Sequence, residues 1–313
     1  MPEFERIATY LAPLAGQQGL GLTDDAALFE PPLGKTLVLA KDMLVAGVHV
    51  PASAAPEVFA QRAMRTNLSD MAAMGAKPLG YLLGLGLPGS VPDTWLEAFA
   101  IALMRDQQAF GCTLWGGDSI KAPTDITISM TLIGAVTPGK ALKRGGAQPG
   151  DDIYVSGHIG AAAAGLKMAL GTLPDGLPEW LLAYEKPMPR LALGQGLVGL
   201  ATACIDVSDG LIADIEHVAQ ASGVCADVRL ADVPIAEGLP IDALTAVTAG
   251  DDYELAFTAP PDRRDAIFTL SERIGVSVSH IGKARERVAS APNVKLLDAT
   301  KTPIKVKDGG WQH

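Results

Sequence analysis

NLSDMAAMGAKP, residues 67–78, closes a segment in which apolar residues recur with the spacing of an α-helix. Its one carboxylate, Asp70, stands among alanines, methionines and a glycine, where a solvent-facing helix end would carry lysines and glutamates. An ionised carboxylate in apolar surroundings costs free energy unless it is paired or bound to a metal ion. The stretch therefore predicts a buried helix over residues 55–75 that carries one functional acid.

Acids of the same kind recur at predicted strand ends and turns, each next to glycine or to another acid. Any one of them could be explained by helix capping or by a turn. Taken together, with few basic residues beside them and no cluster of Cys or His, they favour a hard cation such as Mg²⁺. The segments are GLTDDAAL (Asp24, Asp25), LAKDMLV (Asp42), LWGGDSI (Asp118), CIDVSDGL (Asp206, Asp209) and AGDDYEL (Asp251, Asp252, Glu254).

The composition narrows the class of protein. The 313 residues are 48% hydrophobic and 19% charged, which predicts a large ordered core. The formal net charge of −10 argues against nucleic acid or a membrane surface as a partner, and no apolar run has the length of a membrane span. The three cysteines are widely spaced without a CxxC pair, so we expect reduced thiols and a cytoplasmic location.

The N-terminal segment MPEFERIATYLAPLAG predicts an amphipathic helix and not a signal peptide, because no basic region precedes its apolar residues. Strands are predicted at residues 36–42, 81–87, 125–136, 152–157 and 252–260. Further helices are predicted at residues 92–110, 159–170, 189–203, 209–222 and 261–274.

The two kinds of element alternate irregularly, so the pattern fits an α+β fold as well as a doubly wound sheet. Glycines and Pro149 in RGGAQPGDD, residues 144–152, predict a boundary between a domain at 1–148 and a domain at 149–313.

Two segments are similar to known nucleotide-binding motifs but do not match them fully. GLGLPG, residues 84–89, has the spacing of a dinucleotide-binding loop, but the following helix begins too late to place its N-terminus on a pyrophosphate. GAVTPGKA, residues 134–141, resembles a P-loop, but Ala141 stands where a Mg²⁺-binding hydroxyl is needed. We interpret it as a strand end and a turn, so any ATP site must be built in another way.

The chain resembles the thiamine-monophosphate kinases from about residue 4 to the terminal GGWQH. The resemblance is carried by seven segments that occur in the same order as in that family, which are GLTDDAAL, KDMLVAGVHV, NLSDMAAMGAKP, GGDS, LKRGGAQPGD, IDVSDGL and AGDDYEL. Thiamine-monophosphate kinases belong to the superfamily of aminoimidazole-ribonucleotide synthetase-like ATP enzymes. The resemblance implies a two-domain α+β fold. The strands of the N-terminal half would build a barrel across a homodimer, the C-terminal half would be a second α+β domain, and ATP would lie in a cleft between the halves.

The resemblance also implies residue roles. Asp70, Asp118 and Asp42 would act most directly in catalysis. Mg²⁺ ligands would be Asp25, Asp42, Asp70, Asp118, Asp206 and Asp209. ATP would contact Gly117, Asp118, Arg144 and Ser208. Thiamine monophosphate would contact His49, Asp251 and Trp311.

The sequence departs from the family at a few of these positions. Ala40 and Lys41 occupy places where Ser or Thr hydroxyls are usual, and Met43 replaces a common Thr. Asp251 replaces a usual Glu and shortens its reach by one methylene.

The implied reaction is in-line transfer of the γ-phosphoryl group of ATP to thiamine monophosphate, assisted by several Mg²⁺ ions, to give thiamine diphosphate. Magnesium ions would reconcile an acidic protein with anionic substrates. Two alternatives stay open from the sequence. One is another ATP enzyme of the superfamily, of the ring-closing or ligase type, and the other is a non-catalytic, nucleotide-binding maturation partner.

Overall fold

The computed structural model describes residues 1–288, 290 and 292–306. The chain forms two compact units, which are described separately. Unit 1 contains Met1–Met71 and Lys77–Pro138, and unit 2 contains Ala72–Ala76 and the chain from Gly139 onward. Within the described residues, no helix has both the length and the apolarity needed to cross a bilayer.

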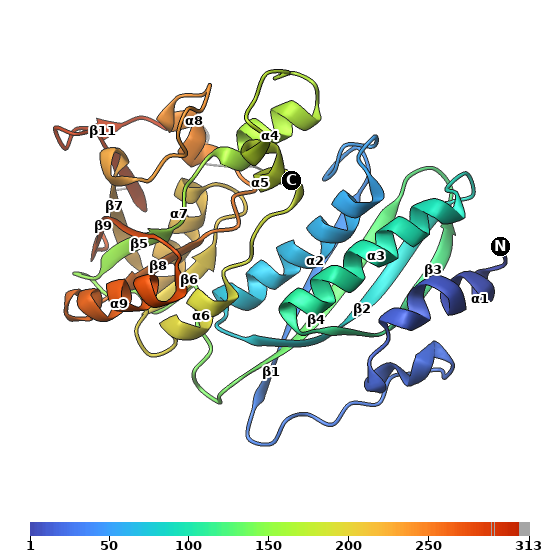
Figure 1. Cartoon of the computed structure of the whole chain (residues 1–313). Coiled ribbons are helices and arrows are strands. Elements are labelled where there is room, and N and C mark those ends of the chain that lie inside the picture. The colour runs from blue at the N-terminus through green and yellow to red at the C-terminus, as the bar shows by residue number, and fades with distance from the viewer. Residues whose placement is uncertain (289, 291, 307–313) are drawn as a thin grey trace. The chain divides into compact units, whose positions relative to one another are not determined.

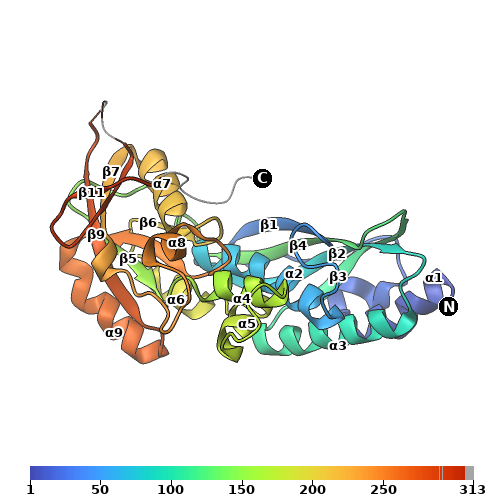
Figure 2. The same ribbon diagram turned by 90° about the horizontal axis from the view of Figure 1, so that it is seen from above.

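Unit 1 is built on a four-stranded sheet in the order β1-β4-β2-β3, one face of which is covered by α2 and α3 (Figures 1 and 2). β4 pairs antiparallel with β1 and β2, and β3 runs parallel to β2. Short helical turns precede the sheet. The elements are α1 (Glu3–Arg6), η1 (Ile7–Leu11), η2 (Ala12–Leu14), η3 (Gln17–Leu22), β1 (Thr36–Val45), α2 (Pro56–Ala73), β2 (Lys77–Pro88), α3 (Asp93–Phe110), β3 (Thr113–Ala122) and β4 (Thr127–Val136).

The two faces of this sheet differ in what they bury. Successive residues of a strand point to opposite faces, so the pairing register divides the residues into two sets. Buried residues such as Leu83 and Met130 share the helix-covered face, and Asp42 lies in register with them. The opposite face carries exposed apolar side chains, which are Leu37, Leu39, Met43, Leu82 and Ile120. This second face is called the open sheet face below.

A buried ion pair ties the two helices of unit 1 together. Arg65 on α2 donates from Nε and Nη2 to the two carboxylate oxygens of Asp106 on α3, both at 2.8 Å. Both residues are buried, and a guanidinium matches a carboxylate in this two-bond geometry. Asp106 is therefore a structural acid, neutralised by the chain itself.

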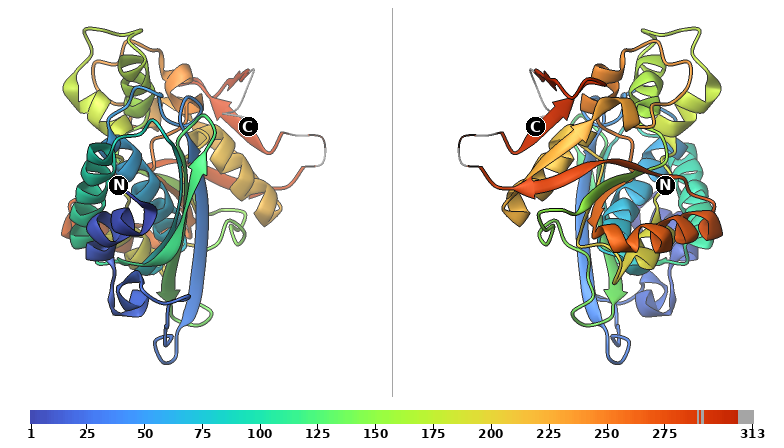
Figure 3. Two further views of the ribbon diagram at one scale, coloured as in Figure 1. Left: turned by 90° about the vertical axis from the view of Figure 1, so that its right-hand side faces the viewer. Right: turned by 90° about the vertical axis from the view of Figure 1, so that its left-hand side faces the viewer.

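Unit 2 contains a seven-stranded sheet in the order β11-β10-β7-β9-β5-β8-β6, with helices on both faces (Figure 3). Its strands are β5 (Asp152–Ser156), β6 (Ala203–Asp206), β7 (Val224–Arg229), β8 (Leu255–Ala259), β9 (Val278–Glu286), β10 (Val294–Leu297) and β11 (Pro303–Ile304). Its helices are α4 (Ala161–Ala169), α5 (Pro178–Glu185), α6 (Leu191–Leu197), α7 (Leu211–Ser222), η4 (Leu230–Asp232), α8 (Ala243–Thr248), η5 (Pro261–Arg263) and α9 (Arg264–Ile274).

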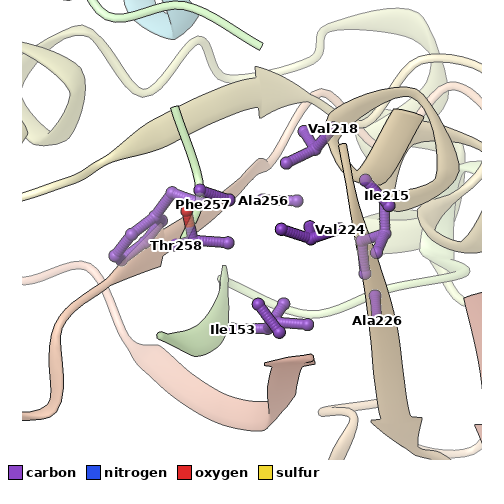
Figure 4. A pocket seen from close by; sticks show the side chains of 11 residues that line it. Ile153, Ile215, Val218, Val224, Ala226, Ala256, Phe257 and Thr258 are labelled. Carbon is purple, nitrogen blue, oxygen red and sulfur yellow. The ribbon is translucent and has the colours of Figure 1, made fainter. Parts of the chain in front are cut away.

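Alternate side chains of β5 point to opposite faces of this sheet and pack into two separate apolar clusters. Ile153 and Val155 pack in one apolar cluster with α7, whereas Tyr154 packs in a second cluster with α6 and α9. The α7 cluster contains a small cavity of about 10 Å³ (Figure 4). Its lining is apolar apart from Thr258, so it offers too few partners for an ordered water and is a packing gap.

The structure confirms the α+β fold class with two domains and excludes the doubly wound alternative, because most strand pairs are antiparallel. The near-P-loop is a strand end and a turn, as expected. The helix expected at 189–203 was too long, since α6 ends at Leu197 and β6 begins at Ala203. The sequence patterns missed the strands β3, β6, β7, β9, β10 and β11.

Candidate functional site

In unit 1, Asp42 and Asp70 project toward a common side of α2. Thr66 on α2 donates its hydroxyl to Asp42 Oδ2 at 3.5 Å, which fixes the side of α2 that faces β1. Asp70 follows Thr66 by four residues and therefore lies on the same side of the helix, one turn further on. Burial raises the pKa of Asp42, although Thr66 and His49 both act to lower it. A cation beside this carboxylate would offset the cost of its burial.

His49 stands at the end of β1 in the turn that follows it. The backbone N–H of Val45 donates to His49 Nδ1 at 3.1 Å, and the backbone N–H of His49 donates back to the Val45 carbonyl at 3.0 Å. Because Nδ1 accepts a hydrogen bond, the proton of the neutral ring belongs on Nε2. The turn thus fixes the imidazole, whose electrostatic interaction with Asp42 acts to lower the pKa of that carboxyl.

Asp118 lies elsewhere in unit 1. Its register position opposite Gly84 puts it on the open sheet face, whereas Asp42 is on the helix-covered face. Three strand spacings separate β1 from β3, a distance on the order of 14 Å. Gly117 before it must be glycine, because a Cβ there would lie 1.8 Å from the Leu83 carbonyl oxygen. The single chain therefore does not bring Asp118 to Asp42, contrary to our expectation of one compact cage.

Three further predicted site residues are Asp25, Arg144 and Trp311. Asp25 is exposed in the loop between η3 and β1. The carbonyl of Arg144 accepts a hydrogen bond from Ser222 at 3.3 Å, and its side chain is exposed. Trp311 lies outside the described residues.

In unit 2, Asp206 is the last residue of β6, and the loop from β6 to α7, called the acidic loop below, carries Ser208 and Asp209. It is wound around Asp214 of α7, whose Oδ2 accepts the backbone N–H groups of Ser208 at 3.0 Å, Asp209 at 3.1 Å and Gly210 at 3.2 Å. These N–H groups at a helix start would otherwise lack partners. The sequence analysis missed Asp214, although an acid at the first turn of a helix after Asp-Gly is a recognisable capping signal.

The acids around this loop repel one another. Burial raises the pKa of Asp214 to about 8, with further contributions from the charges of Asp206 and Asp209, while its backbone N–H bonds act in the opposite direction. Ligand atoms of Asp209, Asp214 and His217 all lie within 4.8 Å of one another, so they could hold a metal ion. His217 was not among the ligands that the sequence analysis predicted.

The AGDDYEL segment contributes one candidate acid instead of three. Asp252 accepts the backbone N–H of Gly160 at 2.9 Å, and burial raises its pKa. Glu254 is ion-paired with Arg190 and accepts the Ser156 hydroxyl at 2.5 Å. Both side chains are therefore committed to the fold. Asp251, the predicted contact of thiamine monophosphate, accepts a hydrogen bond from the Tyr253 hydroxyl at 3.0 Å.

The fold and the acidic positions define a class of protein. Residues 23–136 match the family model "AIR synthase related protein, N-terminal domain", and residues 148–295 match the model of the corresponding C-terminal domain. The chain is thus a two-domain AIR synthase related protein.

Closer relatives narrow this class. Thiamine-monophosphate kinase of Caulobacter vibrioides is 36% identical over 99% of this chain and 90% of its own. The crystal structure of the Stenotrophomonas maltophilia K279a thiamine-monophosphate kinase has a TM-score of 0.81 at 36% identity, covering 88% of this chain and 89% of that one. A structure of AaThiL complexed with AMPPCP and TMP has a TM-score of 0.77 at 30% identity, covering 93% and 91%. The chain belongs to the thiamine-monophosphate kinase family.

Removing the Asp214 carboxylate should loosen the acidic loop. Asp214→Ala leaves three backbone N–H groups without their acceptor, and we expect a loss of about 3 kcal/mol in the free energy of unfolding, measured by urea denaturation. Asp214→Asn should lose less, because its amide oxygen can still accept. Glu216→Ala, an exposed position on the same helix, should change the value by less than about 0.5 kcal/mol. Equal losses in Asp214→Ala and Glu216→Ala would contradict this role.

Proposed function

We propose that this protein catalyses the ATP-dependent phosphorylation of thiamine monophosphate to thiamine diphosphate. Its membership of the thiamine-monophosphate kinase family supports this assignment, as does its similarity to a structure complexed with AMPPCP and TMP. The observation in the chain itself that carries the proposal is the pair of acidic groups, Asp42 with Asp70 in unit 1 and Asp206 with Asp209 in unit 2. Free thiols buried in the fold suit a reducing compartment, so we expect the protein in the cytoplasm.

The residues present suit Mg²⁺. Carboxylate oxygens are the ligands that hard cations prefer, and Asp42 and Asp214 have the raised pKa of acids held where a positive charge would be favourable. When bound, the ions would supply charge neutralisation along the phosphates. We propose that the ligands are Asp25, Asp42, Asp70, Asp118, Asp206 and Asp209, with Asp42, Asp70 and Asp118 nearest the reacting groups. Because Asp118 lies on the other sheet face from Asp42 in one chain, we propose that its part depends on a second copy.

The substrates would be held by other residues of the chain. For ATP we propose contacts with Gly117, Asp118, Arg144 and Ser208, of which the exposed Arg144 guanidinium can make charge-assisted hydrogen bonds to phosphate. For thiamine monophosphate we propose His49, Asp251 and Trp311.

The acceptor needs no general base from the protein. The second pKa of a phosphate monoester is about 6, so the attacking oxygen already carries its charge near neutral pH. The chain must instead orient two anions in line and hold them together against their repulsion. An acidic loop that binds cations suits this task better than a Ser-His or Cys-His pair would.

Product analysis tests the assignment. The protein incubated with ATP, Mg²⁺ and thiamine monophosphate should form thiamine diphosphate and ADP in equal amounts, as measured by mass spectrometry. EDTA should abolish the reaction, and heat-denatured protein is the control. ADP formation without a new diphosphate would favour a ligase-type relative, and no turnover of ATP would favour a nucleotide-binding partner.

We further propose that a second copy of the chain covers the open sheet face, with strands of both copies forming a barrel. Apolar side chains such as Leu39 and Met43 are 69% and 51% exposed there, in a continuous set on one face of an ordered sheet. Contiguous exposed apolar surface on a sheet marks an interface. Asp118 lies on the same face, so its contact with ATP depends on what covers that face.

Charge placed on the open sheet face should break the homodimer. Leu39→Glu and Met43→Glu are expected to shift the mass measured by light scattering after size-exclusion chromatography from two chains to one, because an interface would bury the new charge. Phe4→Glu, at a side chain that is 83% exposed and off the sheet, should leave the mass unchanged. A wild-type protein with the mass of one chain would refute the barrel.

A further inference from the structure

Two side chains of opposite charge lie on the open sheet face where its four strands pair without interruption. Alternate residues of each strand point to this face. Within the paired segments, which the structure describes in full, the register places Lys41 and Asp118 there as the charged residues. Lys77 shares the face but lies before a bulge in β2, about 20 Å along the strand from Gly84. The segments are residues 41–45 of β1, 127–131 of β4, 82–88 of β2 and 116–122 of β3.

The two charges stand at opposite edges of the sheet, because β1 and β3 are its outer strands. The Lys41 ammonium donates to the Ser129 hydroxyl of β4 at 2.5 Å, so it lies over a strand that is two spacings, about 10 Å, from β3. An ion pair needs its charged atoms within about 4 Å. Lys41 and Asp118 therefore do not pair within one chain.

Both groups keep capacity for a further partner. Asp118 Oδ1 accepts the backbone N–H of Ser119 at 2.9 Å, and Lys41 uses one donor on Ser129. An ammonium has three donors, and a carboxylate has two oxygens that each accept more than one hydrogen bond. A charged group that approached this face could therefore pair with either residue.

The contact with Ser129 brings the ammonium to the level of Asp118. Ser129 lies opposite Gly84, and Gly84 lies opposite Asp118, so the three residues form one row across the sheet. The β1 member of this row is Met43, two residues beyond Lys41, and the lysine side chain reaches toward the row through its bond to Ser129. The positive and the negative group thus stand in the same row, near opposite edges.

Covering this face would make both charges costly. Their neighbours on the face are apolar, and Met43 and Ile120 are 51% and 61% exposed. A charge that is taken out of water among apolar side chains costs free energy unless it gains a partner of opposite sign. The same face of a second copy offers that partner to each of them.

Two arrangements close two such sheets into a symmetric barrel. Either β1 of each copy adjoins β3 of the other, or like edges adjoin. The first arrangement brings Lys41 of one copy beside Asp118 of the other, twice by symmetry. The second puts lysine against lysine and aspartate against aspartate, which is destabilising. The charges therefore favour the pairing of unlike edges.

We infer that each copy of the chain supplies Lys41 as the ion-pair partner of Asp118 in the other copy, across adjoining β1 and β3 edges. This inference rests on the homodimer proposed above. It gives a function to the lysine that stands where the family usually has a hydroxyl, since a hydroxyl brings no charge to Asp118. The acid that we propose contacts Mg²⁺ and ATP is thus held by a cation from the second chain.

A charge-swap cycle tests the pair through the dissociation constant of the dimer, measured by analytical ultracentrifugation. Lys41→Asp and Asp118→Lys each place like charges together and should raise this constant about tenfold or more. The chain with both substitutions restores opposite charges and should return to within about threefold of the wild-type value. Single variants with the wild-type constant, or a double variant that binds no tighter than the single variants, would overturn the inference.

Lys121→Asp is the matched control for the swap. Lys121 is an exposed lysine of the edge strand β3, but its register partner is the buried Leu87, so it belongs to the other face of the sheet. Its substitution should change the dissociation constant by less than about twofold.

Cross-linking tests the contact without relying on charge. A Lys41→Cys chain is mixed with an Asp118→Cys chain and treated with a short bismaleimide. The mixture should give a covalent dimer on a denaturing gel, and neither chain alone should, because like positions lie apart when unlike edges adjoin. The native cysteines are buried, and the wild-type protein is the control. Covalent dimers of the Lys41→Cys chain alone, or none in the mixture, would overturn the inference.

Neither readout needs turnover, so this inference and the proposed function can fail separately. A protein that passes both tests but forms no thiamine diphosphate refutes the proposed function and leaves the ion pair standing. A protein that forms thiamine diphosphate but fails these tests loses the ion pair and keeps the function.

Discussion

The free-energy cost of holding ionised carboxylates close together in a largely apolar fold is the constraint on which this structure depends. The chain meets it in two ways. Some acids are neutralised internally, as Asp106 is by Arg65 and Glu254 is by Arg190. Others, including Asp42 and Asp209, are gathered with acids or His where a cation would be stabilising. The internally neutralised acids stabilise the fold, and the others are the acids that we propose bind metal ions.

In unit 2, hydrogen bonds hold the acidic loop in place from two sides. The acidic loop is held from α7 by Asp214 and from the other side by the loop before β8, in which the backbone N–H of Asp251 donates to the Ser208 carbonyl at 2.9 Å. Gly210 is required between them, since a Cβ there would lie 2.7 Å from the Thr248 carbonyl oxygen. Within unit 2, Ser208 and Asp209, which we propose bind nucleotide and metal, are therefore fixed against the loop that carries Asp251. A phosphoryl transfer that relies on orientation gains from this rigidity.

Periodicity sufficed to predict the long helices α2 and α3, because their apolar spacing is set by local geometry. It left the α+β class open against a doubly wound sheet, and the family resemblance decided between the two. Periodicity missed β3, whose glycines and exposed Asp118 do not look like a strand when seen without their neighbours. The register also separated Asp118 from Asp42, which spacing along the chain could not reveal. The hydrogen bond from the backbone N–H of Tyr253 to the Val207 carbonyl depends on two loops meeting in space, and no local pattern encodes it. The capping bonds of Asp214 are local, and their signal was overlooked.

Turnover of Asp70→Asn at saturating Mg²⁺ tests the central claim most directly, namely that these acids hold the cations on which phosphoryl transfer depends. The substitution preserves the shape of the side chain and removes its charge, so the melting temperature should be unchanged. The account predicts that kcat for thiamine diphosphate formation falls on the order of 10²–10³-fold, as when one electrostatic contact is removed from a transition state. A variant that folds normally and turns over at close to the wild-type rate would contradict the account.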